Sequence, residues 1–262
     1  MQIDLTGKKA IVCGSSQGIG KAAALKLAVA GAEVTLIARD EAKLKSVLDE
    51  LSSQNGQAHS YIVADFSQPD HLRGKMKEFM SDGRMINILV NNTGGPRAGE
   101  AINAETTEFL SAFTNHLICN QIMVQSVVEG MKKSGYGRII NIISTSVKQP
   151  LKGLGVSNTI RGAVASWAKT LANELGAFGI TVNNVLPGAT KTERLFSLFK
   201  TKSETSGKAV AEVEAEWLKE IPAGRFAEPD ELANAILFLA SPMASYINGI
   251  NLPVDGGRTG SL

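Results

Sequence analysis

A glycine-rich turn is the first segment of the chain whose residues could do chemistry. Gly14, Gly18 and Gly20 stand between an apolar run and a run rich in alanine and leucine. Glycine permits a tight turn and a close approach to a pyrophosphate, and the N–H groups at the start of a following helix attract negative charge. The spacing alone also fits an ordinary turn. The residues expected to bind phosphate are Gly14, Ser16, Gln17, Gly18, Ile19 and Gly20.

Three later segments place polar groups directly after apolar runs. They are residues 65–66, 91–94 and 187–192. Ligands of open α/β sheets bind where parallel strands end, and a carboxylate such as Asp65 can meet an adenine edge there. These segments predict a dinucleotide site where the strands end. Its further residues are Asp65, Phe66, Asn91, Thr93, Gly94, Pro187, Gly188, Thr190 and Thr192.

The elements that must position these residues alternate along the chain. Apolar runs predict strands at 8–13, 33–38, 58–64, 86–90, 138–143, 181–186 and 250–253. Apolar residues at helical spacing predict helices at 19–30, 41–51, 69–81, 105–133, 157–177 and 229–240. This alternation indicates an α/β fold, a Rossmann-type doubly wound parallel sheet of about seven strands with helices on both faces. We expect residues 1–262 to form a single domain.

Residues 189–220 are expected to form a flap over the end of the sheet. The stretch 190–208 is predicted to be irregular and solvated, because Ser, Thr and Glu dilute its basic residues. An amphipathic helix is predicted near 208–219. The apolar side chains of the flap could contact a hydrophobic or acyl substrate, or could pack the flap onto the body; they are Leu195, Phe196, Leu198, Phe199 and Trp217.

The composition narrows the class of partner. A formal net charge of +2 over 262 residues, without a dense basic run, gives no reason to expect a nucleic-acid partner. No apolar run is long enough to span a membrane, and the first residues lack the basic and apolar pattern of a secretory signal, so we expect neither membrane spanning nor export. Cys13 and Cys119 are expected to be buried packing residues, and we expect a cytoplasmic protein without a metal site.

The chain resembles the short-chain dehydrogenase/reductase family, and is similar to its 3-oxoacyl-(acyl-carrier-protein) reductase-like branch. The resemblance covers almost the whole chain. It rests on the glycine turn and on the segments 91–94, 137–142, 187–188, 221–222 and 255–257. It implies an oxidoreductase that binds a nicotinamide dinucleotide and a small-molecule, possibly acyl, substrate. It also implies a homotetramer, with the helices near 105–133 and 157–177 at the dimer faces and the C-terminal tail at the second contact.

Arg39 favours NADP(H) over NAD(H). Members of the family that use NAD usually have a carboxylate where the second strand ends, but this chain has Ala38 followed by Arg39. A guanidinium suits a 2′-phosphate. Asp40 weakens the argument, although its expected role is to cap the next helix.

The catalytic positions depart from the family pattern of Asn, Ser, Tyr and Lys. Counting from 137–142 and from Asn92, these positions fall on His116, Ser144, Ser157 and Arg161. The resemblance therefore implies a degenerate Tyr–Lys motif. Ser157 and Arg161 lie four apart on one helix face, so Arg161 can still hold the nicotinamide ribose. Its guanidinium cannot shuttle protons, and a serine hydroxyl is a much weaker acid than a phenol.

Three functions remain open. The chain could be a reductase with another proton donor, for which His116 (whose ordinary pKa suits transfer near neutrality), Lys148, Lys152 and water are candidates. It could bind NADP(H) without turnover, as a sensor or partner subunit. It could also perform different chemistry on the same scaffold.

Overall fold

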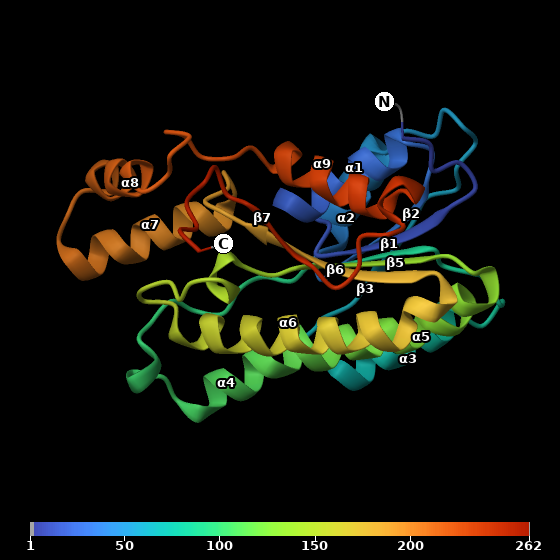
Figure 1. Cartoon of the computed structure of the whole chain (residues 1–262), viewed down its shortest axis with the longest axis horizontal. Helices are drawn as coiled ribbons and strands as arrows, with labels where there is room; N and C mark the ends of the chain where they lie inside the picture. The colour runs from blue at the N-terminus through green and yellow to red at the C-terminus, as the bar shows by residue number, and fades with distance from the viewer. Residues whose placement is uncertain (1–2, 262) are drawn as a thin grey trace.

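A computed structural model describes residues 3–261 of the chain (Figure 1). Its centre is a parallel sheet of seven strands in the order β3-β2-β1-β4-β5-β6-β7. The order reverses between β1 and β4, which is the crevice where doubly wound sheets bind ligands. The strands are β1 (Lys9–Cys13), β2 (Glu33–Ala38), β3 (Ser60–Val63), β4 (Ile88–Asn91), β5 (Gly137–Ile142), β6 (Ile180–Pro187) and β7 (Asn251–Val254).

Helices cover both faces of the sheet. In Figure 1, α1, α2 and α9 lie on one side of the strands, and α3 to α6 lie on the other. The helices are α1 (Gly18–Val29), α2 (Glu41–Glu50), α3 (Pro69–Phe79), α4 (Thr106–Phe113), α5 (Cys119–Ser134), α6 (Gly155–Leu175), α7 (Glu193–Ser206), α8 (Val210–Lys219) and α9 (Pro229–Ala240). Short 3₁₀ turns occur at Ala101–Asn103, Thr145–Val147, Gly176–Phe178 and Pro242–Ala244.

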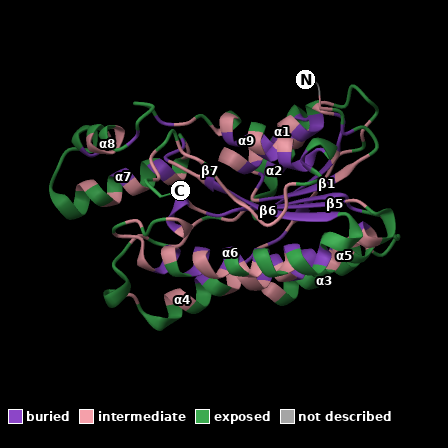
Figure 2. Ribbon diagram, viewed as in Figure 1, coloured by how far each residue is buried: buried purple, intermediate pink, exposed green. Residues whose placement is uncertain are grey.

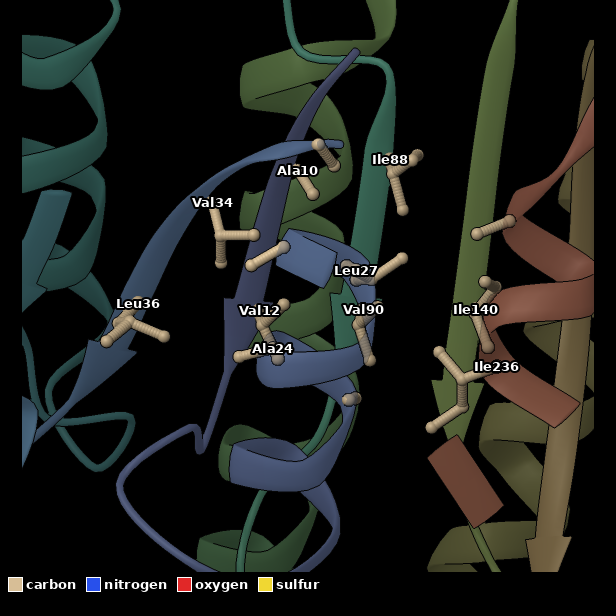
Figure 3. Packing of buried hydrophobic residues seen from close by; sticks show 14 of the residues in the cluster. Ala10, Val12, Ala24, Leu27, Val34, Leu36, Ile88, Val90, Ile140 and Ile236 are labelled. Carbon is tan, nitrogen blue, oxygen red and sulfur yellow. The ribbon is translucent and has the colours of Figure 1, made fainter. Parts of the chain in front are cut away.

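The core has one layer on each side of the sheet, as Figure 2 shows by the buried strands between partly exposed helices. In the layer under α1 and α9, Leu27 and Ile236 pack against Val90 and Ile140 of the central strands (Figure 3). Because both faces of the strands are covered, β5 is buried over its whole length. The expected α/β class is confirmed, and the predicted boundaries differ from those observed by one or two residues at most of the ends.

Two predicted elements were wrong in detail. The helix expected at 105–133 is interrupted by a π-helical turn at Thr114–Ile118, so it forms α4 and α5. The stretch expected to be irregular contains α7. Thr192 caps this helix by accepting a hydrogen bond from Leu195 N at 3.4 Å, and Leu195 and Phe199 bury its inner face. Since these contacts depend on α8, sequence composition alone did not reveal them.

A chain of asparagine side chains crosses the sheet from β4 to β7. The amide of each donates to the next at 2.8–2.9 Å, in the order Asn91, Asn141, Asn184 and Asn251. The same residues are paired in the backbone register. The chain therefore fixes the register of the four strands that carry one half of the site.

The remaining fold observations concern the cysteines and the helices. Cys13 and Cys119 are both fully buried and unpaired, as expected. Burial raises the pKa of the Cys119 thiol to about 11. Among the described residues, no helix combines the length and the apolar character that crossing a membrane requires.

Candidate functional site

A cleft of about 1280 Å³ opens at the carboxyl ends of the strands. It runs from the ends of β2 and β3, past the glycine turn, to the start of α6 and the flap helix α7. Both the expected phosphate segment and the expected catalytic segment line this one cavity. The cavity therefore lies at the switch point of the sheet, where an extended ligand can bind. After the roles expected of their residues, we call the part lined by Ser144, Ser157 and Arg161 the reacting end and the part lined by Arg39 and Asp65 the adenosine end.

The glycine turn leaves room for an anion at the start of α1. Gly14 and Gly18 have φ of +59° and +57°, which side chains rarely adopt. A Cβ on Gly20 would meet Gly14 O at 2.2 Å, so this glycine lets α1 pack closely on the turn. The N-cap residue Gln17 makes no side-chain capping bond, and the first turn holds no acidic residue. The uncapped N–H groups fit the pyrophosphate of a dinucleotide.

The adenosine end of the cleft carries positive charge. Arg39 is exposed and lines it, together with Lys43, which the sequence argument missed. Asp40 caps α2 by accepting from Lys43 N at 3.0 Å, as predicted. Lys43 Nζ donates to Gln17 Oε1 at 3.0 Å, which ties α2 to the glycine turn. These contacts leave the Arg39 guanidinium available at the strand end.

The reacting end brings three of the predicted catalytic residues together. Ser144 follows β5, and its Oγ accepts from Ser146 N at 3.1 Å. Ser157 and Arg161 lie one turn apart on α6, and both line the cleft although they are only 8 % and 7 % exposed. Arg161 donates from Nη1 to Ile142 O at 3.0 Å, which fixes the guanidinium beside the end of β5.

His116 lies behind this end of the cleft. It is 1 % exposed, in the π-helical turn, and its Nδ1 lies 2.5 Å from Thr93 Oγ1. Burial, together with the charges of Arg161 and Arg194, lowers the pKa of His116 to about 2. The expected pKa near neutrality is therefore wrong, because burial and the two nearby guanidinium groups disfavour an imidazolium there. His116 lines a smaller cavity of about 280 Å³ instead.

The other side-chain candidates for the proton donor do not line the cleft either. Lys148, Lys152 and all three tyrosines are absent from its lining. Tyr61 Oη donates to Glu41 at 3.0 Å and Tyr136 Oη to Ala240 O at 2.7 Å. Tyr246 is fully exposed. No tyrosine therefore stands in for the missing phenol among the residues that line the cleft.

Arg194 is the functional candidate that the sequence argument missed. It was counted among solvated flap residues, but it is half-buried and lines the cleft from the first turn of α7. Its Nη2 donates to Pro96 O at 2.5 Å, and burial lowers its pKa. The signal was present in Thr192 as an N-cap before Leu195 and Phe199 at helical spacing.

Most, but not all, of the predicted site residues line the cleft. Those that do are Gly14, Ser16, Gln17, Gly18, Ile19, Arg39, Asp65, Phe66, Thr93, Gly94, Ser144, Ser157, Arg161, Pro187, Gly188, Thr190 and Thr192. Gly20, Asn91 and His116 do not. The side chain of Asn91 belongs to the chain of asparagines that crosses the sheet. Its neighbour Asn92, which was not named among the expected site residues, lines the cleft, and its side-chain amide donates to Gly14 O at 3.2 Å.

Some apolar residues of the flap pack within it, and others are exposed in the cleft. Phe199 is fully buried and packs edge-on against Trp217, with ring centroids 5.3 Å apart, so the flap has a small core of its own. Phe196 is 56 % exposed and lines the cleft with Leu198. An apolar part of a substrate can therefore contact the outer side of α7.

With this geometry in place, the chain can be compared with known proteins. Residues 14–259 match the family profile described as enoyl-(acyl carrier protein) reductase. The chain belongs to the short-chain dehydrogenase/reductase family. Among its curated relatives, a 3-oxoacyl-[acyl-carrier-protein] reductase FabG of Vibrio cholerae is 33% identical over 97% of this chain and 98% of its own length. The uncharacterized oxidoreductase YvaG of Bacillus subtilis is 31% identical over the whole of both chains.

Solved structures agree with this membership. L-sorbose reductase from Gluconobacter frateurii, complexed with NADPH and L-sorbose, superposes with a TM-score of 0.92 over 100% of both chains at 30% identity. YwfH, an NADPH-dependent reductase involved in bacilysin biosynthesis, gives a TM-score of 0.91 at 27% identity, over 97% of this chain and 99% of the other. The chain is thus an oxidoreductase by family, with relatives whose structures hold NADP(H).

Proposed function

We propose that this protein is an NADP(H)-dependent oxidoreductase that interconverts a carbonyl and a hydroxyl group on a small molecule, with an atypical catalytic set. The observation that carries the proposal is the continuity of the cleft, which joins the phosphate turn to Ser144 and Arg161. Two ends of one cavity can then hold a dinucleotide and a substrate at once. Relatives that hold NADPH, such as the L-sorbose reductase, support the choice of cofactor.

The cofactor contacts fall to the chain's own residues. The first turn of α1 would bind the pyrophosphate, Arg39 the 2′-phosphate, and Arg161 the nicotinamide ribose. When bound, the reduced cofactor supplies a hydride. Asp65 at the end of β3 and the segment 187–192 after β6 would hold its two ends. These assignments rest on the position of each residue along the cleft.

The residues at the positions expected to transfer the proton differ from the family pattern. Ser144 would hydrogen-bond the substrate oxygen, and the charge of Arg161 would stabilise negative charge that develops there. Ser157 is too weak an acid to donate, and His116 is uncharged at neutral pH. Water that enters the open cleft is therefore the proton source in this proposal. The reaction would be slower than one with a positioned phenol, since general acid catalysis contributes about 10²–10⁴-fold.

A silent cofactor-binding module is the second candidate. The absence of a tyrosine from the cleft lining and the depressed pKa of His116 both favour it. As such a module the chain would sense NADP(H) or serve as a partner subunit. We place it second because Ser144 and Arg161 still line the reacting end.

Replacement of Ser144 by Ala separates the two functions. Loss of NADPH absorbance is measured with a panel of ketones and oxo acids, and NADPH affinity is measured by its fluorescence. For a reductase we expect turnover that falls about 10²-fold in S144A, with NADPH affinity unchanged. Ser81→Ala, exposed just after α3 and outside the cleft, is the matched control. NADPH binding without oxidation across the panel would instead establish the silent module.

A further inference from the structure

Two arginines, the buried Arg161 and the half-buried Arg194, face the reacting end of the cleft without a counter-ion among the described residues. Arg161 and Arg194 both line it. Within residues 3–261, each makes one hydrogen bond, to the backbone oxygen of Ile142 or of Pro96. Neither takes part in an ion pair in that part of the chain. A guanidinium has five N–H donors, so most of the donors of each remain for a ligand.

The neighbouring acidic groups do not compensate these charges. Glu193, next to Arg194, accepts from Gln17 Nε2 at 2.8 Å. Two other cations of the lining have their own partners, since Lys191 pairs with Glu228 and Arg258 with Glu220. Arg161 and Arg194 therefore differ from those two in having no carboxylate partner among the described residues.

The pKa values of Arg161 and His116 reflect these uncompensated positive charges. Burial and the charge of Arg194 lower the pKa of Arg161 to about 10, and no carboxylate raises it. The charges of both arginines also contribute to the low pKa of His116. Two like charges that act on each other in a buried site are unfavourable unless an anion joins them.

The phosphates of a dinucleotide would not supply this anion. They belong to the glycine turn and to Arg39, at the opposite half of the cleft, and the ribose that Arg161 can reach is uncharged. The anion must therefore come with the substrate. Leu151, Leu154, Phe196 and Leu198 also line the cleft, so the rest of the substrate can be apolar.

We propose that Arg161 and Arg194 bind the carboxylate of an oxo-acid substrate and so place its carbonyl beside Ser144. The inference rests on the proposed reductase function. In the reaction, a hydride from NADPH adds to the carbonyl carbon, the C–O π electrons move to oxygen, and that oxygen takes a proton from water. An oxo acid, NADPH and a proton thus give a hydroxy acid and NADP⁺. The planar guanidinium matches a carboxylate through paired hydrogen bonds.

The test compares acids with their neutral esters. The probes for turnover are 2-oxohexanoate and phenylpyruvate against their methyl esters. The corresponding 2-hydroxy acids and their esters are titrated calorimetrically into the protein with NADPH, where no hydride transfer can occur. We expect each acid to bind at least about tenfold more tightly than its ester, and kcat/KM to favour the oxo acid similarly. Equal binding of acid and ester would overturn the inference.

Substitutions of Arg194 test whether this residue causes the preference for the acids over the esters. Arg194→Met should weaken binding of the hydroxy acids at least about tenfold and leave the esters unchanged, while Arg194→Lys should retain part of the difference. Arg97→Met is the matched control, because Arg97 is exposed and lies outside this cleft. If Arg194→Met does not fold, the Lys variant and the comparison of acid with ester still decide.

The two proposals fail in different ways. NADPH binding with equal reduction of acids and esters would leave the reductase function standing and remove the anion site. Hydroxy-acid binding to the NADPH complex without turnover of any oxo acid would keep the anion site and remove the reductase. If Arg97→Met also lost the preference for acids over esters, the preference would come from the overall positive charge of the protein and not from Arg161 and Arg194.

Discussion

Among single residues, Arg39 is the one on which the choice of cofactor depends. It is exposed at the end of β2 and lines the cleft, while Asp40 beside it is engaged in capping α2. We predict that Arg39→Ala raises the Kd of NADPH by about tenfold or more and that of NADH by less than about twofold, because only NADPH carries the 2′-phosphate. Titration of cofactor fluorescence measures both.

Two variants serve as controls for that prediction. Arg39→Lys should keep part of the preference, since it retains the charge but not the bidentate geometry. Arg73→Ala removes an exposed arginine on α3, outside the cleft, and should change neither affinity. Equal weakening of NADPH and NADH by Arg39→Ala would contradict the assignment.

The low pKa of His116 leads to a prediction about how stability depends on pH rather than about catalysis. Its pKa in the folded protein is about 2, below the value near 6.5 expected in the unfolded chain. Between these values the unfolded chain binds a proton that the folded protein does not, so stability falls as the pH falls below about 6.5. The loss attributable to this group is about 1.4 kcal/mol per pH unit.

The measurement is urea unfolding of the wild type and of His116→Gln between about pH 6.5 and 4.5. We expect the glutamine variant to lose less stability over this range, since it has no proton to take up in the unfolded state. Parallel pH dependence in the two proteins would mean that His116 is not held neutral by the fold. His71→Gln, on exposed α3, provides the control.

Among the strands, the chain of asparagine side chains leads to a prediction about the free energy of unfolding. Asn141 both accepts from Asn91 and donates to Asn184, each at 2.9 Å, and it is fully buried. Asn141→Ala would leave the buried atoms Asn91 Nδ2 and Asn184 Oδ1 without this partner, at a cost of about 2–4 kcal/mol in the free energy of unfolding. Chemical denaturation measures this, with Asn234→Ala on the exposed side of α9 as a control within about 0.5 kcal/mol. A loss below about 1 kcal/mol for Asn141→Ala would show that the chain contributes little.

Helices and strands differed in how far local pattern could predict them. The strands and α1, α2, α3 and α9 contain apolar residues at strand or helix spacing, and these residues join the two core layers of the sheet. The π-helical turn at Thr114–Ile118 breaks an otherwise continuous helical pattern, and no residue type in it announces the break. The helix α7 was concealed by its polar composition, because its apolar face is covered by α8 and by Phe226 rather than by the sheet.

For the whole molecule, we predict a homotetramer in the cytoplasm. The assembly is implied by the resemblance to the family, and Leu110 and Phe113 of α4 are 66 % and 38 % exposed, on a helix of the expected dimer face. Sedimentation equilibrium should give about four times the chain mass of 27.7 kDa. A monomer at micromolar concentration would contradict the prediction. Leu110→Glu should weaken the assembly, whereas Val29→Glu, exposed at the end of α1 on the other side of the sheet (Figure 1), should not.

The sequence by itself determined the class of fold, the glycine turn, the strand ends that meet at the cleft, and the absence of a tyrosine–lysine pair at the expected spacing. These depend on local chemistry: glycine at positive φ, apolar runs of strand length, and residues four apart on one helix face. Only the tertiary structure decided the charge state of His116 and the burial of Arg194. Both depend on desolvation by segments distant in the sequence, since Arg194 meets Pro96 across 98 positions and His116 is enclosed by neighbours that no local pattern names.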